Sequence, residues 1–158
     1  MKKAFKLILS FGLAIVIIIG YNSCKKEETS CPVPETPKTV EQLLTAKTWK
    51  ADEIRIQQSN NTTQYYKRGS VGTTYDSDSL KFAANNTGTY YYSGSAFPIT
   101  WNLTDAAKTK MTVVINQPPT PITIYIENMN ITDTYFKYSQ YYNGSGLNYM
   151  ASCTRTPN

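Results

Sequence analysis

The chain has 158 residues, of which 16 are Lys or Arg, 11 are Asp or Glu and none is His, giving a formal net charge of +5. Without histidine it lacks the commonest general base, the commonest metal ligand, and the Ser-His and Cys-His nucleophile pairs. The sequence also contains no phosphate-binding glycine loop and no cysteine-rich metal spacing. We therefore expect a protein that is not an enzyme and holds no metal or cofactor.

The first 23 residues have the pattern of a secretory signal peptide. Residues 1–6 carry three lysines, and residues 7–21 form an apolar run without a charge. A helix of these 15 residues would span about 22 Å, short of the roughly 30 Å hydrocarbon core, so an uncleaved anchor is the less favoured alternative. Removing residues 1–23 leaves 13 basic against 11 acidic residues, a net charge of +2 with no concentrated basic face. We expect no nucleic-acid partner.

Cys24 follows this segment, with the small residue Ser23 before it and a polar stretch after it. The arrangement resembles the lipobox of bacterial lipoproteins, which implies that Cys24 is acylated and becomes the first mature residue. The next four residues resemble the export tag of surface lipoproteins of the Bacteroidetes: Lys25, Lys26, Glu27 and Glu28. The resemblance implies a lipid-anchored outer-membrane protein with its domain on the cell surface. A periplasm-facing domain, with charges that only solvate a tether, is the alternative.

Residues 24–38 are expected to form a lipidated, proline-rich tether, because regularly spaced prolines favour extended chain. If Cys24 is acylated, Cys31 and Cys153 are the two thiols that remain. An oxidising compartment would favour a disulfide between them. Two free thiols are an equal alternative, since the sequence gives no distance between the residues.

The folded domain, residues 39–158, is expected to start with a short helix. Thr39 is placed to cap it and Gln42 to complete the capping box, while Glu41 suits the first turn. From Trp49 onward, apolar residues alternate with polar ones, as in strands that have one buried face. A bulge in the first strand would bring Trp49 into phase with Ile54 and Ile56.

The expected strands are short and are separated by turn residues such as Ser93-Gly94 and Asn143-Gly144. Alternation is clearest in residues 97–103, 111–115, 122–127, 136–139 and 147–153. The polar stretch 59–78 is harder to assign, although residues 64–67 fit a strand and Asp76-Ser77-Asp78 fit a solvated turn. We expect an all-β antiparallel meander of about eight strands, closed as a small barrel or, alternatively, paired as a β-sandwich.

Several motifs occur in an order that resembles lipocalin-like domains of Bacteroidetes lipoproteins. They are Leu43-Leu44, Trp49, Asp78-Ser79-Leu80-Lys81-Phe82, Asn86-Thr87-Gly88-Thr89-Tyr90, Trp101-Asn102-Leu103 and Ile131-Thr132-Asp133-Thr134-Tyr135-Phe136. The resemblance covers residues 39–158 and implies a lipocalin-like barrel. It also implies a cation–π stack of Arg155 on Trp49, with a core Trp49 and a frayed Arg155 as the alternative.

Tyrosine is abundant, with 12 of 13 lying after the signal and many in pairs or triplets. Aromatic rings with a polar tip suit the mouth of a barrel or a sugar- or peptide-binding surface, although they also stabilise strands. Candidate ligand-binding residues are Tyr90, Tyr92, Trp101, Tyr125 and Tyr138. Two functions follow. One is the binding of a small apolar or aromatic-compatible ligand in or at the mouth of a barrel. The other is adhesion or assembly, in which exposed tyrosines contact glycan or protein and the barrel has no cavity. If Tyr90, Tyr92, Trp101, Ile124 and Tyr138 all point inward, a small barrel could be filled, which would weaken the first.

Overall fold

The computed structural model describes residues 36–144 and 146–158. The expected signal, lipobox, export tag and Cys31 therefore lie outside the described residues. Within the described ranges, no helix has the length and apolar character needed to cross a membrane.

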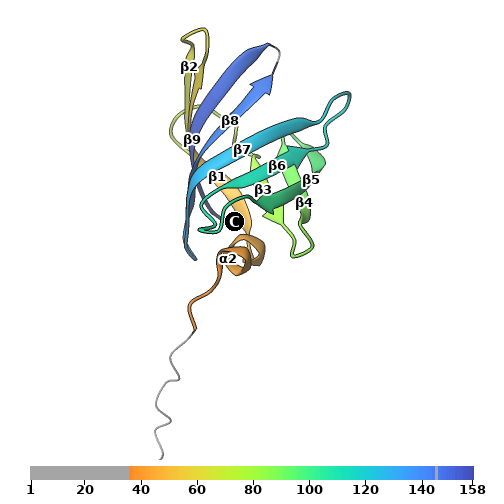
Figure 1. Ribbon diagram of the computed structural model, residues 1–158. Helices are drawn as coiled ribbons and strands as arrows, with labels where there is room; N and C mark the ends of the chain where they lie inside the picture. The colour runs from red at the N-terminus through yellow and green to blue at the C-terminus, as the bar shows by residue number, and fades with distance from the viewer. Residues whose placement is uncertain (1–35, 145) are drawn as a thin grey trace, which may run out of the picture. The chain divides into compact units, whose positions relative to one another are not determined.

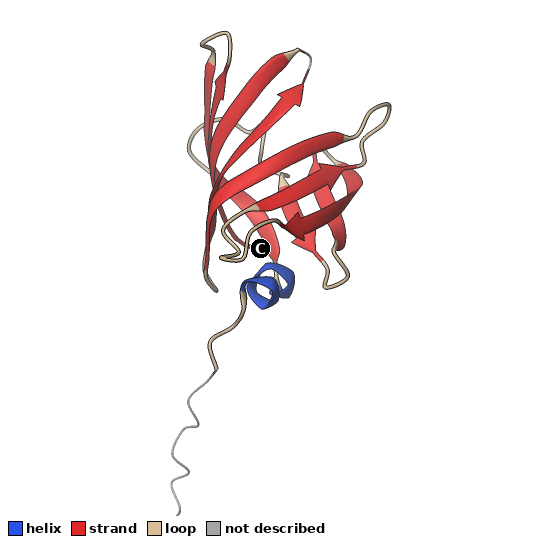
Figure 2. Ribbon diagram, viewed as in Figure 1, coloured by secondary structure: helices blue, strands red, loops and turns tan. Residues whose placement is uncertain are grey.

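A short helix precedes the strands, as expected. Helix α2 (Val40–Ala46) begins at Thr39, whose hydroxyl accepts a hydrogen bond from the Gln42 amide while the Gln42 side chain accepts one from the Thr39 amide. Its buried residue is Leu44, and the Trp49 indole donates to the Leu44 carbonyl oxygen at 3.0 Å. The helix lies at one end of the sheet (Figure 2), so this contact fixes it over that end.

Nine antiparallel strands follow the helix (Figure 1). They are β1 (Thr48–Gln58), β2 (Thr63–Lys67), β3 (Ser79–Phe82), β4 (Thr87–Tyr92), β5 (Ser95–Leu103), β6 (Met111–Ile115), β7 (Ile122–Ile131), β8 (Phe136–Gly144) and β9 (Leu147–Pro157). Each strand from β3 to β8 pairs with the next, and β9 pairs with β1, which also pairs with β3. Eight strands thus close a barrel and confirm the expected fold, while β2 lies outside the ring.

Strand β1 carries the expected bulge. Its register against β9 shifts between Ala51 and Glu53. The extra residue, Asp52, lets Trp49 and Ile54 both face the interior, where they are 0% and 4% exposed. The same strand pairs with β3 over Thr48–Lys50 and with β2 over Glu53–Gln57, so its outer edge changes partner halfway along.

The helix-covered half of the barrel is filled by aromatic side chains. Edge-to-face or tilted ring contacts link Trp49, Phe82, Trp101, Phe136 and Tyr138. Such pairs add about 0.5–1.5 kcal/mol each beyond burial of their area. This half is therefore a packed core.

Candidate functional site

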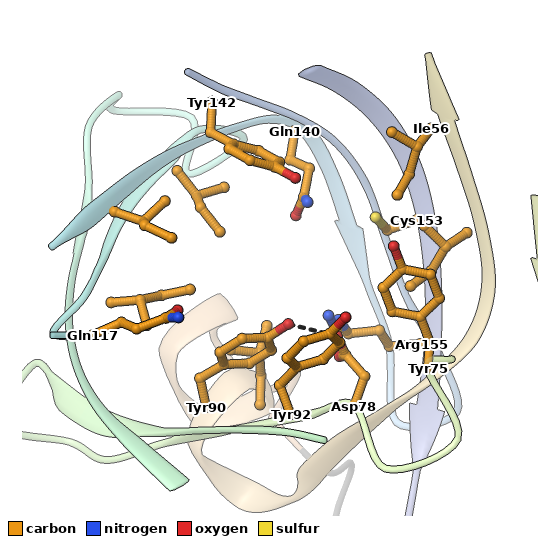
Figure 3. Close-up of a pocket in the computed structure, with 15 residues that line it drawn as sticks. Ile56, Tyr75, Asp78, Tyr90, Tyr92, Gln117, Gln140, Tyr142, Cys153 and Arg155 are labelled. Carbon is orange, nitrogen blue, oxygen red and sulfur yellow. Dashed lines mark hydrogen bonds and ion pairs between the residues drawn. The ribbon is translucent and has the colours of Figure 1, made fainter. Parts of the chain in front are cut away.

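The other half of the barrel encloses a cavity of about 190 Å³. Its side chains surround an open space (Figure 3). The apolar part of the wall consists of Ile54, Ile56, Leu80, Ile115, Ile122 and Ile124. An apolar space of this kind, with a few polar groups pointing into it, is the usual form of a small-molecule site.

Strand alternation places most of these side chains. Tyr90 and Tyr92 lie on the inner face of β4, whereas Tyr91 between them is 38% exposed. Tyr75 instead comes from the β2–β3 connection and packs between the rings of Tyr66, at 5.5 Å, and Tyr92, at 6.0 Å. No alternation could reveal Tyr75, because it belongs to a polar loop.

A buried ion pair forms the floor of the cavity. Arg155 Nη1 lies 2.6 Å from Asp78 Oδ1, and the two side chains are 4% and 3% exposed. The Tyr90 hydroxyl donates to Asp78 Oδ2 at 2.7 Å, and Arg155 Nε donates to the Tyr138 hydroxyl at 2.7 Å. The expectation that Asp78 belongs to a solvated turn is thus wrong: its carboxylate is buried because Arg155 and Tyr90 satisfy both oxygens.

This environment shifts several pKa values. Burial acts to lower the pKa of Arg155, but the Asp78 carboxylate outweighs it and holds that pKa well above its usual range. Burial raises the pKa of both Tyr90 and Tyr138, so their hydroxyls keep their protons. The floor therefore holds the Arg155 cation against the Asp78 carboxylate, and the two charges offset each other.

Cys153 lies in the cavity wall and is 3% exposed. Burial raises the pKa of this thiol to about 11. Its expected disulfide with Cys31 stays a prediction, since Cys31 lies outside the described residues.

Five polar side chains reach the cavity without a hydrogen-bond partner among the described residues: Tyr75, Tyr92, Gln117, Gln140 and Tyr142. Their hydroxyl and amide groups come from the β2–β3 loop, β4, the β6–β7 loop and β8. They are spread around the space in Figure 3 and can donate or accept hydrogen bonds there. Sequence reasoning selected only Tyr92 from this set.

The five candidate ligand-binding residues lie in four different places. Tyr90 and Tyr92 line the cavity, whereas Tyr138 is buried in its floor. Trp101 lies in the filled half, 3% exposed, with its indole donating to the Thr87 carbonyl oxygen. Tyr125 is the clear error. It is 45% exposed on the outer face, because β7 turns Ile122, Ile124 and Ile126 inward instead.

The inward-facing aromatic residues do not fill the barrel, as they were expected to if all of them pointed inward. Tyr90, Tyr92, Trp101, Ile124 and Tyr138 do all belong to the inner face. A cavity nevertheless remains, because the large rings of Trp101 and Tyr138 gather toward the helix-covered half and its boundary. Inward aromatic residues fill one half of this barrel and line the other.

Arg155 does meet Trp49, but not as the expected ring stack. Its Nη1 donates to the Trp49 carbonyl oxygen at 3.3 Å, and its guanidinium carbon lies 6.0 Å from the centre of the Tyr138 ring. The Trp49 ring instead contacts Phe136 edge-on at 5.8 Å. Arg155 is held by Asp78 and is not a frayed terminal residue, since it is 3% exposed.

A second aromatic group lies on the outer face of the barrel. Tyr125 on β7 and its neighbour Tyr141 on β8 stack at 5.1 Å, with their rings 17° from parallel. Met150, which pairs with Tyr141 from β9, is 63% exposed. We call these three residues the outer patch. Their exposed side chains suit the adhesion alternative.

Within the described ranges, no three Cys, Asp or Glu side chains come together in a group that could hold a metal ion. Comparisons with protein-family models, with curated proteins and with solved structures gave no match.

Proposed function

We propose that this chain is a lipid-anchored binding protein of the cell envelope that holds a small ligand in the open half of its barrel. The observation that carries the proposal is the cavity of about 190 Å³, with isoleucine walls and with hydroxyl and amide groups that have no hydrogen-bond partner among the described residues. Apolar walls favour a ligand with an apolar body, and the few polar groups would set its orientation. The lipobox and export-tag resemblances at Cys24 and residues 25–28 support an outer-membrane anchor and surface display, as in Bacteroidetes lipoproteins of lipocalin-like type.

Native mass spectrometry of the protein extracted from its own envelope in mild detergent tests this proposal. We expect a bound small molecule, lost in Ile124→Trp, whose larger side chain would fill the cavity from β7. Tyr125→Trp is the matched control, because it enlarges the adjacent residue on the outer face, and it should retain the ligand. An identical unliganded mass for wild type and both variants, in repeated extracts, would reject the cavity as the functional site.

The outer patch favours adhesion as a second candidate function. Exposed aromatic rings with hydroxyl groups suit contact with glycan or protein. A glycan array would support adhesion if wild-type protein binds and the double variant Tyr125→Ser/Tyr141→Ser does not. Binding that survives this change, or that is lost in Ile124→Trp, would count against it.

A further inference from the structure

The cavity floor offers hydrogen-bond donors that the protein leaves without an acceptor. Arg155 Nε donates to Tyr138, and Nη1 donates to Asp78 and to the Trp49 carbonyl oxygen. Nη2 has no acceptor in the described part of the chain, although Arg155 is 3% exposed and lines the cavity. Hydrogen bonds from a charged donor are stronger than those between neutral groups, so a ligand acceptor placed at Nη2 would gain a strong hydrogen bond.

The charges of the floor select against an anionic ligand. Asp78 and Arg155 are the only charged side chains among the cavity-lining residues, and they neutralise each other. A ligand carboxylate at Nη2 would share the guanidinium with the Asp78 carboxylate and be buried without a balancing positive charge, which is unfavourable. A neutral oxygen acceptor avoids this repulsion.

Size and wall shape restrict the rest of the ligand. An apolar protein cavity of about 150 Å³ holds one benzene molecule, so the 190 Å³ found here fits one ring with a small substituent. The rings of Tyr90 and Tyr92 lie 8° from parallel and 6.0 Å apart. Together with the isoleucine walls, they present surfaces that suit a flat, apolar ring.

We propose, resting on the function proposed above, that the ligand is a neutral, single-ring compound bearing a carbonyl oxygen. That oxygen accepts from Arg155 Nη2, the ring packs on Tyr90, Tyr92 and the isoleucines, and no ligand charge enters the site. The partner-free hydroxyl of Tyr142 and amide of Gln140 lie within the same cavity for any further polar substituent.

Three probes of nearly equal size test this: toluene, benzamide and benzoate, titrated into the full chain at pH 7.5 and followed by calorimetry. We expect benzamide to bind about tenfold or more tightly than either other probe. Toluene binding as tightly as benzamide would overturn the carbonyl assignment, and benzoate binding most tightly would overturn the neutral-ligand assignment. In both of those cases the cavity would still bind small ligands. No binding by any probe would overturn this inference and count against the proposed function as well.

Arg155→Lys gives the site-specific readout, because lysine keeps the charge beside Asp78 without a second terminal nitrogen. Benzamide affinity should fall to that of toluene, while toluene affinity stays the same. A second measurement does not depend on the variant folding: carbonyl-labelled benzamide bound to wild type should show a downfield ¹³C shift from its value in water. An unchanged or upfield shift would overturn the hydrogen bond to Arg155.

Discussion

Asp78→Asn should strongly destabilise the domain. The substitution preserves shape but leaves the Arg155 guanidinium buried, at 4% exposure, without its counter-charge. Breaking a buried pair by removing one partner costs about 3–5 kcal/mol, a large share of the roughly 5–15 kcal/mol that stabilises a typical domain. Tyr90 also loses the carboxylate that accepts the hydrogen bond from its hydroxyl.

Urea unfolding followed by tryptophan fluorescence measures this cost, because Trp49 and Trp101 are 0% and 3% exposed and report the core. Asp52→Asn is the matched control: Asp52 and Lys67 also lie 2.6 Å apart, but their side chains are 24% and 37% exposed. Water screens that pair, so the change in the free energy of unfolding caused by Asp52→Asn should lie within experimental error. Equal costs for the two variants would refute the assigned role of the buried pair. The double variant Asp78→Leu/Arg155→Met should be more stable than Asp78→Asn, since it buries no unpaired charge.

Four further outcomes are expected. Gly88→Ala should cost about 1–3 kcal/mol in the same urea assay, because a Cβ there would lie 2.2 Å from the Lys81 carbonyl oxygen; a neutral result would contradict that geometry. Burial raises the pKa of Tyr66 to about 12 and of Cys153 to about 11, so the folded state keeps protons that the unfolded chain releases above about pH 9–10. The contribution of these two groups to the free energy of unfolding should be fully present below that range and should be lost as pH rises through 9–12. Equal urea midpoints at pH 8 and 10.5 would contradict this prediction. Iodoacetamide at pH 8 should alkylate Cys153 on the order of a hundredfold more slowly than in urea-unfolded protein, as followed by mass spectrometry. Cys24→Ala should abolish incorporation of labelled palmitate in cells, whereas continued labelling would exclude Cys24 as the anchor.

Much of the barrel could be predicted from local pattern. Alternation in residues 122–127 fixed which side chains of β7 share a face, and the phase conflict between Trp49 and Ile54 located the bulge of β1. The capping box at Thr39 is equally local. These features depend on neighbours in sequence, where the periods of helix and strand act directly.

The candidate site was harder to predict because its parts meet only through the closed ring. Asp78 and Arg155 are far apart in sequence, so neither reveals that the other neutralises it. Asp78 was therefore assigned to a solvated turn, and Arg155 to a ring stack on Trp49 or, alternatively, to a frayed chain end. Tyr125 could have been excluded, since the three isoleucines of β7 already occupy the opposite face. The positions of Trp101 and Tyr138 along the barrel axis could not be predicted, because alternation distinguishes inside from outside but not one end of a barrel from the other.

The change of partner along β1 has a kinetic consequence. Beside the cavity, β1 pairs with β2 instead of β3, and the gap toward β4 is spanned by the connection that carries Tyr75. Here the wall is held by ring contacts and by separate hydrogen bonds, such as those from the Tyr66 hydroxyl to Asp76 and from the Ser93 amide to the Ser77 hydroxyl, not by a continuous backbone ladder. Lateral opening at this point breaks far fewer interactions than parting two paired strands. We therefore expect the proposed ligand to exchange through this side of the wall on the timescale of a loop motion, while the eight-stranded ring stays intact.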